Sequence, residues 1–332
     1  MKISASLFSK KSEWVTYANQ LEYTGVDYIH IDYVDGENAP VKISMLTSKM
    51  SRIPYDVHII APELKEATIK ELNGTATAYL CVQYENLLNK EDLEKLNWFN
   101  GHHGISFTIE TPIEVLESYI EKSDFILIMC SKPGVSGATF DEGNIERIRY
   151  LREKYPALPI HVDGGIDDKR IAVMENLGVS LCVSGSYLAS TDGMSLIRRV
   201  CELKFRDPNV RVADIMTLRK NLSPIAVHRD FFQLLQNIND SQSGTAFVED
   251  DKGEFVGIIT DGDVRRTILN EKKRVFSLLV RDIVNRGPYC VKRSNRLAEV
   301  FLERMLLQKN VMVIPVVEDG ILVGAIDLKK YF

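Results

Sequence analysis

Short apolar runs alternate with longer amphipathic stretches through residues 1–205. The runs are bounded by Gly, Pro and Asp, which is typical of short parallel strands buried on both faces. Eight such runs occur, at Ile3–Phe8, Tyr28–Asp32, Tyr55–Ile60, Ala78–Gln83, Gly104–Thr108, Phe125–Cys130, Pro159–Asp163 and Leu181–Ser184. Helical periodicity marks stretches between them, at Glu13–Tyr23, Pro112–Lys122, Ile145–Tyr155 and Lys169–Leu177. Eight strand–helix units over this length predict a (β/α)8 TIM barrel at residues 1–205.

The pattern changes at Phe205–Asn209, where Asp-Pro-Asn is typical of a turn. Beyond it the chain repeats itself. Residues 246–260 and 313–326 each form a strand pattern, an acidic turn, and a second strand pattern containing Val-Gly and two apolar residues. A helical pattern precedes each copy, at Phe231–Asn239 and Leu297–Gln308. This repeat predicts an α+β second domain at 210–332, built from two modules at about 210–270 and 280–332.

Composition and charge narrow the class of protein. The chain has 332 residues, of which 45% are hydrophobic and 26% charged, which excludes a disordered or fibrous protein. A net charge of -5 gives no reason to expect nucleic acid as a partner. The sequence has no apolar run long enough for a membrane span, and because residues 1–14 contain no apolar stretch we expect no secretory signal. Its five cysteines include no Cys-x-x-Cys pair, so we expect reduced thiols in a cytoplasmic protein.

Four residues at predicted strand ends suggest a metal site. His30 and Asp32 are two apart on one strand, so their side chains share a face. His58 ends the next strand and Asp163 ends the seventh. Barrel active sites lie at this rim. Each residue alone could be structural, but two imidazoles and two carboxylates together suit zinc, iron, manganese or cobalt.

Small residues follow three neighbouring strands of the same rim. Gly164 and Gly165 follow the seventh strand, Gly185 and Ser186 the eighth, and a loop reaching Gly137 the sixth. Each glycine could serve a tight turn, yet these are the loops where barrels often bind phosphate. A metal, two carboxylates and a phosphate site suit proton abstraction beside a carbonyl, because the metal stabilises the enediolate oxygen.

These segments resemble the ribulose-phosphate 3-epimerase family over most of residues 2–190. The resemblance rests on residues 5–8, 29–36, 56–58, 127–137, 162–166 and 184–186. It implies a metal-dependent epimerase that inverts C3 of a ketose phosphate, D-ribulose 5-phosphate to D-xylulose 5-phosphate or a close relative, by two-base proton transfer. It implies His30, Asp32, His58 and Asp163 as metal ligands, with Asp32 and Asp163 as the acid–base pair. The implied substrate contacts are Ser6, Met129, Gly137, Gly164, Gly165, Gly185 and Ser186.

Several pocket positions depart from the family pattern, and they leave two other readings open. Val34 and Ile60 stand where methionine is usual, Val41 replaces an asparagine and Gln83 a histidine. In the altered loop after the sixth strand, Lys132 either contacts the phosphate or faces solvent. The alternatives are a sugar-phosphate-binding regulator that has lost catalysis, and a metal-dependent isomerase or lyase of polysaccharide biosynthesis.

The second domain resembles a pair of CBS modules, through Val212–Met216, Val256–Arg266 and Val323–Asp327. The resemblance implies that Thr260 and Asp263 hold the ribose of an adenine or other nucleotide. Arg265, Arg266 and the cluster Lys272–Arg274 could meet its phosphates. In the second copy Asp327 and Lys330 stand where the hydroxyl and the aspartate are usual, so we expect one ribose site. The alternative is that the CBS pair serves dimerisation alone. With either role we expect a homo-oligomer. The segment Thr260–Arg266 also resembles CBS pairs attached to enzymes of surface-polysaccharide pathways, and by that analogy we expect a bacterial biosynthetic enzyme.

Overall fold

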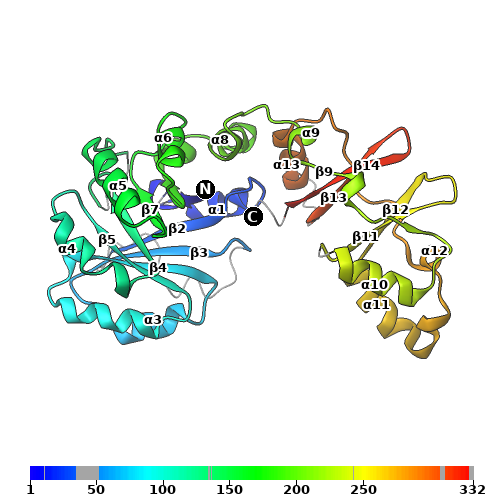
Figure 1. Ribbon diagram of the computed structural model, residues 1–332, viewed down its shortest axis with the longest axis horizontal. Helices are drawn as coiled ribbons and strands as arrows, with labels where there is room; N and C mark the ends of the chain where they lie inside the picture. Colours follow the sequence, from blue (N-terminus) through cyan, green and yellow to red (C-terminus); the bar gives the residue numbers. More distant parts are fainter. Residues whose placement is uncertain are drawn as a thin grey trace. The chain divides into compact units, whose positions relative to one another are not determined.

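The computed structural model describes residues 1–10, 12–34, 52–133, 135, 137–241, 243–306 and 311–328 (Figure 1). The chain forms two compact units, Met1–Pro208 and Asn209–Phe332. Among the described residues, no helix is both long and apolar enough to cross a membrane.

The first unit is a closed barrel of eight parallel strands, as predicted. The strands are β1 Lys2–Ser6, β2 Tyr28–Val34, β3 Tyr55–Ile60, β4 Thr77–Gln83, β5 His102–Phe107, β6 Phe125–Met129, β7 Ile160–Asp163 and β8 Leu181–Ser184. Each strand pairs with the next, and β8 returns to β1. All strand C-termini therefore meet at one rim, where the predicted site residues lie.

Helices surround this barrel (Figure 1). The α-helices are α1 Trp14–Leu21, α3 Glu66–Leu72, α4 Ile113–Glu117, α5 Gly143–Lys154, α6 Arg170–Asn176, α7 Ser186–Ala189 and α8 Gly193–Phe205. The 3-10 helices are η1 Phe8–Lys10, η2 Tyr84–Asn86, η3 Lys90–Trp98 and η4 Ile120–Lys122. The single helix predicted at Pro112–Lys122 is divided into α4 and η4. Ser118 ends α4, and its hydroxyl donates a hydrogen bond to the Val115 carbonyl, an alternative to continuing the helix.

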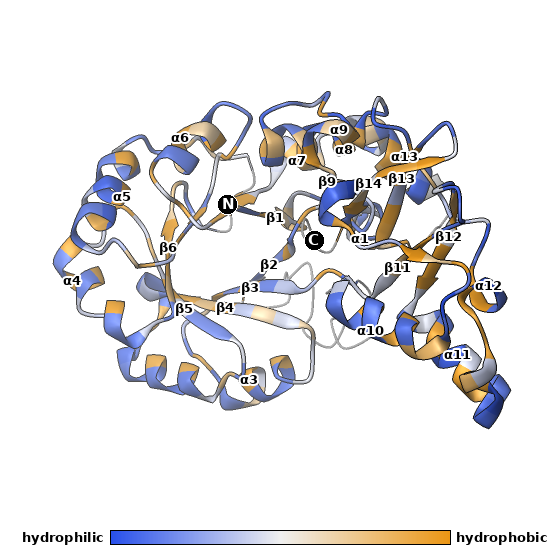
Figure 2. Ribbon diagram, turned by 45° about the vertical axis from the view of Figure 1, so that its right-hand side comes forward, coloured by the Kyte–Doolittle hydropathy of each residue, from blue (hydrophilic) through white to orange (hydrophobic). Residues whose placement is uncertain are grey.

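Two hydrophobic layers hold the barrel together. The larger lies between strands and helices and includes Ile3, Val57 and Ile128, all with no exposed surface. The smaller fills the barrel interior around Phe125 and Leu127. Figure 2 shows the strong apolar character of β6, against helices with polar and apolar faces. Burial of both strand faces explains why these strands are near-continuous apolar runs in the sequence.

The second unit contains two three-stranded sheets that follow the sequence repeat. Their strand orders are β10–β11–β12 and β13–β14–β9. The strands are β9 Thr217–Leu218, β10 Ile225–Ala226, β11 Thr245–Glu249, β12 Phe255–Thr260, β13 Val313–Glu318 and β14 Ile321–Asp327. The helices are α9 Val212–Ile215, η5 Arg219–Asn221, α10 Phe231–Ser241, α11 Asp261–Glu271, η6 Lys272–Ser277, α12 Val280–Ile283 and α13 Leu297–Leu306.

Each repeat receives backbone from the other. Strand β9 belongs to the first module yet pairs with β14 of the second, while Asn285 of the second module bridges to Ile258 on β12 of the first. Glycines permit both approaches. A Cβ on Gly257 would lie 2.0 Å from the Asn285 carbonyl oxygen, and one on Gly324 would lie 2.5 Å from that of Thr217. The two copies are thus interlocked, so we expect them to fold together.

Candidate active site

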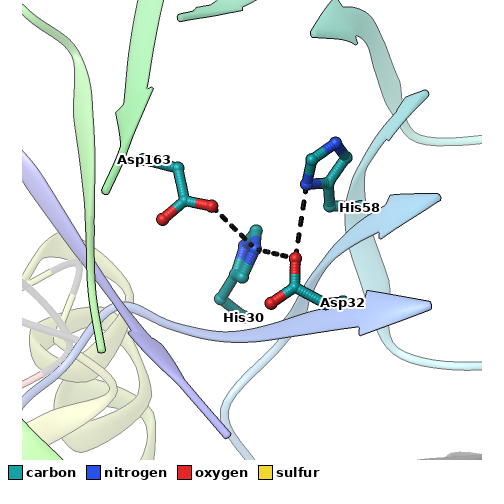
Figure 3. A group of neighbouring side chains, drawn as sticks. All are labelled: His30, Asp32, His58 and Asp163. Atoms are coloured by element: carbon teal, nitrogen blue, oxygen red, sulfur yellow. Dashed lines mark ion pairs between the residues drawn. The ribbon is translucent and has the colours of Figure 1, made fainter. Parts of the chain in front are cut away.

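Four side chains converge at the C-terminal rim of the barrel (Figure 3). His30 and Asp32 project from β2, and His58 and Asp163 from β3 and β7. Asp32 lies beside His58 in the β2–β3 register. The candidate ligand atoms all lie within 4.8 Å of one another. The four residues singled out in the sequence therefore form one cluster.

Among the described residues, three of the four imidazole nitrogens in this cluster lack hydrogen-bond partners. His30 Nε2 lies 3.5 Å from Asp32 Oδ1 and 3.6 Å from Asp163 Oδ2, and His58 Nδ1 lies 3.4 Å from Asp32 Oδ1. Among the described residues, His30 Nε2 and both ring nitrogens of His58 are buried without a hydrogen bond. Such atoms are costly to bury unsatisfied. A divalent cation between the two imidazoles and two carboxylates would satisfy them, and the donor set suits zinc, iron, manganese or cobalt.

The two carboxylates of the cluster differ in acidity. Burial opposes ionisation of Asp32, but the neighbouring His30 and His58 outweigh it and hold the pKa of Asp32 well below its usual range. Burial raises the pKa of Asp163 to about 6, with Asp32 and Asp56 adding to the shift against the opposing effect of His30. One site thus combines a strongly acidic carboxyl with one that holds a proton more readily, a difference useful for moving protons in both directions.

A pocket opens directly above the cluster. It is lined by all seven predicted substrate contacts, Ser6, Met129, Gly137, Gly164, Gly165, Gly185 and Ser186, together with Asp32 and Asp163. His30 and His58 have no exposed surface and lie beneath it. Lys132 also lines this pocket. The pocket is therefore lined both by two carboxylates and by glycine-bearing loops after β6, β7 and β8.

Packing requires the adjacent glycines after β7. Gly164 and Gly165 have φ values of 109° and 65°, in the region that side chains disfavour. A Cβ on Gly164 would lie 2.6 Å from the Ser131 nitrogen, and one on Gly165 would lie 2.9 Å from the Phe140 Cα. Both glycines let the loop after β7 pack against the segment after β6. This packing role is compatible with the phosphate-binding role expected from the sequence.

Several pocket residues lie in or beside the segments that carry the resemblance but were not among the predicted substrate contacts. Ser131, Val135, Ala138 and Ile166 line the pocket with Phe8 and Ser9 of η1, the 3-10 helix that follows β1. Their position just beyond strand ends is a signal that could have identified them. Gln83, in contrast, is buried, and its Oε1 accepts a 2.9 Å hydrogen bond from Ser106 Oγ on β5. This departure from the family pattern joins two strands. Val41 lies outside the described residues.

In the second unit, Thr260 and Asp263 lie together at the start of α11. The Thr260 hydroxyl donates a 2.6 Å hydrogen bond to Asp263 Oδ2, and the Thr260 amide donates one of 2.8 Å. Arg266 Nη2 donates to Asp263 Oδ1 at 2.6 Å. Burial opposes ionisation of Asp263, but these groups lower its pKa below the usual value. The pair therefore caps the helix while presenting a hydroxyl and a carboxylate.

Register relates this pair to the second copy. Thr260 pairs with Thr245 across one hairpin, and Asp327 pairs with Val313 at the corresponding place in the other. Asp327 thus occupies the position of Thr260, as its place in the repeat suggested. Lys330 lies outside the described residues. Arg265 lies on α11, and Lys272–Arg274 begin η6.

Comparison with known proteins gives the chain two sets of relatives. The ribulose-phosphate 3-epimerase family profile matches residues 2–189, and the CBS domain profile matches 212–270 and 280–330. Ribulose-phosphate 3-epimerase from Chlamydia muridarum is 30% identical over 202 residues, covering 56% of this chain and 87% of its own length. The Schizosaccharomyces pombe protein of that name is 29% identical over 171 residues, covering 49% and 75%.

Among solved structures, the CBS-pair protein CBSX2 from Arabidopsis thaliana aligns with 37% of this chain and 92% of its own, at 24% identity and a TM-score of 0.32. CBSX2 in complex with AMP aligns with 35% and 89%, at 26% identity and a TM-score of 0.31. The family matches confirm the predicted fusion of barrel and CBS pair, and the relatives' name confirms the isomerase class expected for the family. The chain belongs to the ribulose-phosphate 3-epimerase family and carries a C-terminal pair of CBS domains.

Proposed function

We propose that this chain is a metal-dependent epimerase that inverts C3 of a ketose phosphate, converting D-ribulose 5-phosphate to D-xylulose 5-phosphate or acting on a close relative. One observation carries the proposal. Asp32 and Asp163 come from β2 and β7, border one pocket, and surround buried imidazole nitrogens that lack partners. His30, Asp32, His58 and Asp163 would hold the ion, which when bound supplies a positive charge that polarises a carbonyl and favours an enediolate.

The two carboxylates perform the proton transfer. One accepts the C3 proton as the electrons move into the C2–C3 bond of the enediolate. The other returns a proton to C3 from the opposite face, which inverts the centre. Epimerisation in this scheme requires that one carboxyl begin the reaction without its proton while the other retains one. In the reverse reaction the two residues exchange roles.

The pocket would orient the substrate between its carboxylates and its glycine-bearing loops. Ser6 on β1 and Met129 on β6 line the same pocket as the two carboxylates. Gly137, Gly164 and Gly165, with Gly185 and Ser186, would hold the phosphate, chiefly through backbone amides. With the phosphate held there, C3 of a five-carbon ketose phosphate would lie near Asp32 and Asp163. The altered walls, with Lys132 and Val135, leave a related sugar phosphate as the competing substrate.

Proton NMR in D2O tests the proposal. Purified protein with known metal content is incubated with D-ribulose 5-phosphate, and we expect xylulose 5-phosphate to appear with deuterium at C3. Asp32→Asn and Asp163→Asn should each lose turnover by more than about 100-fold, as removal of a general acid or base predicts. Asp168→Asn, an exposed neighbour in the loop after β7, is the matched control and should retain full activity.

The other outcomes separate the alternatives. Near wild-type turnover by either Asp32→Asn or Asp163→Asn contradicts the two-base mechanism. Metal without exchange at C3 indicates an isomerase or lyase acting on another sugar phosphate, which product analysis would identify. No metal and no exchange across a panel of ketose phosphates indicates a binding regulator instead.

We also propose that the CBS pair binds an adenine or other nucleotide through Thr260 and Asp263. The match to the CBS profile and the adjacent hydroxyl and carboxylate support this role. Arg266 already contacts Asp263, so a nucleotide ribose would compete with that ion pair. Calorimetric titration with AMP should show one site per chain, and Asp263→Asn should weaken it. If Asp263→Asn leaves the heat of AMP binding unchanged, the nucleotide binds at another site.

Self-association through the CBS pair is the further expectation. Phe232, Leu269 and Phe276 on α10, α11 and η6 are 61%, 75% and 73% exposed. Large exposed apolar side chains on helices that pack together, η6 with α10 and with α11, favour contact with a second copy. Light scattering should give at least twice the monomer mass, and Phe276→Ser should lower that value. A monomeric wild-type protein would exclude this role.

A further inference from the structure

Asp56 lies behind the metal cluster and outside the substrate pocket. It belongs to β3, two residues before His58, so both side chains point into the barrel. In the β2–β3 register Asp56 pairs with His30, and the next inward pair is Asp32 with His58. Asp56 Oδ2 lies 2.9 Å from His30 Nδ1. Both residues are buried, with Asp56 3% exposed and His30 not exposed.

This contact determines which nitrogen of His30 faces the cluster. An ionised carboxylate only accepts hydrogen bonds, so His30 Nδ1 carries the hydrogen and donates it to Asp56. In a neutral imidazole the lone pair then lies on Nε2. That atom points toward Asp32 and Asp163, at 3.5 and 3.6 Å, and has no hydrogen-bond partner among the described residues. His30 is therefore aligned to give a lone pair to a cation at the centre.

The second histidine has no comparable support. Neither ring nitrogen of His58 makes a hydrogen bond within the described part of the chain, and its Nδ1 lies 3.4 Å from Asp32 Oδ1. The two imidazoles thus differ: His30 is held from behind by a buried carboxylate, and His58 is held by packing. Loss of the Asp56 carboxylate should therefore lower the metal affinity of the cluster through its effect on His30 alone.

We propose that Asp56 is a positioning residue that fixes the tautomer and orientation of His30 and thereby raises the affinity of the centre for a divalent cation. The proposal rests on the proposed function, because it assumes that the cluster binds metal. Asp56 does not line the substrate pocket described above, so its effect passes through His30. A carboxylate behind a metal-binding histidine commonly changes metal affinity by about 10–100-fold.

Cobalt binding tests this role without an activity assay. The metal-free full-length protein is titrated with Co²⁺, and its visible absorption reports occupation of the site. Asp56→Asn keeps the shape and an acceptor oxygen but removes the charge, and we expect the Kd for Co²⁺ to rise about 10–100-fold. Asp92→Asn is the matched control: Asp92 is a buried carboxylate of the same unit, bonded to the Leu64 amide and Lys95. Its Co²⁺ affinity should stay within about twofold of wild type.

A second measurement avoids dependence on how well Asp56→Asn folds. Nitrogen-15 NMR of the zinc-loaded, histidine-labelled wild-type protein reports the tautomer of each imidazole. With the His30 signals assigned by their absence in His30→Ala, we expect a hydrogen on Nδ1 and none on Nε2. The reverse tautomer overturns the proposal.

The results also separate this proposal from the proposed function. Wild-type protein that takes up no Co²⁺ contradicts both. Wild-type and Asp56→Asn proteins with equal affinities contradict only the role of Asp56 and leave the metal centre intact. Equal weakening by Asp56→Asn and Asp92→Asn attributes the effect to lost stability and also overturns the positioning role.

Discussion

Replacing Lys132 with methionine removes the one cation among the described residues that line the substrate pocket. The same pocket holds the carboxylates of Asp32 and Asp163, which repel an incoming phosphate. Lys132 lies in the loop after β6 and lines this pocket together with the glycines expected to bind that phosphate. The charge of Lys132 therefore suits the phosphate of the substrate, and Lys132→Met measures how much this charge contributes to substrate binding.

The size of the effect follows from the exposure of Lys132. Hydrogen bonds to charged groups contribute about 1.5–3 kcal/mol. Lys132 is exposed, so water and salt screen its charge and favour the lower end of that range. About 1.5 kcal/mol corresponds to roughly a 10-fold rise in KM. The phosphate does not react, so the contact is equal in the ground and transition states and kcat should change by less than about twofold.

Steady-state kinetics of Lys132→Met, Lys132→Arg and the wild type, each at low and high salt, would measure this contribution. We expect the wild-type KM to rise with salt, the methionine variant to show a weaker salt dependence, and arginine to restore most of the affinity. Lys122→Met in η4, away from the pocket, is the control for a lost surface charge. An unchanged KM in Lys132→Met would refute the reasoning and place the lysine in solvent.

Three further predictions concern the glycines and the metal. Gly165→Ala should reduce kcat/KM and destabilise the barrel by about 2–4 kcal/mol, because alanine disfavours the positive φ and its Cβ would overpack against Phe140. Kinetics and urea unfolding would measure both effects, and activity equal to wild type would contradict this. Gly257→Ala should lower the unfolding midpoint of the CBS pair, because the new Cβ would meet the Asn285 carbonyl; an unchanged calorimetric transition would contradict the interlock. Removing metal with a chelator should abolish deuterium exchange at C3 and lower the melting temperature, because an ion that binds only the folded state stabilises it; exchange that persists after complete chelation would exclude metal dependence.

The strands were more predictable than the helices for a physical reason. A strand buried on both faces leaves an apolar run, whereas a short surface helix leaves a weak periodic signal. Helix η3 shows the difficulty: its buried Leu93 and Leu96 are three residues apart, the spacing of a 3-10 helix, in an otherwise polar segment. The division of the stretch after Pro112 likewise depends on a hydroxyl contact made by Ser118.

Strand periodicity and barrel geometry predicted the four clustered residues of the candidate site, but not the contacts that depend on strand register. Spacing of two placed His30 and Asp32 on one face, and the rim of a barrel brought them near His58 and Asp163. The same spacing joins Asp56 to His58, but its partner His30 depends on the register between β2 and β3, which one sequence does not reveal. The packing role of Gly164 similarly depends on where Ser131 lies.

Reciprocal effects on binding affinity would reveal whether the CBS pair regulates the barrel. If a nucleotide at Thr260 and Asp263 changes the affinity of the barrel for sugar phosphate by some factor, the sugar phosphate must change nucleotide affinity by that factor. We expect AMP titrations of the metal-loaded protein to give different Kd values with and without a saturating, equilibrated mixture of the two ketose phosphates, in which no net turnover occurs. Asp263→Asn should weaken AMP binding and leave basal epimerisation unchanged. Equal Kd values would show that the nucleotide does not sense the barrel, leaving assembly as the function of the CBS pair.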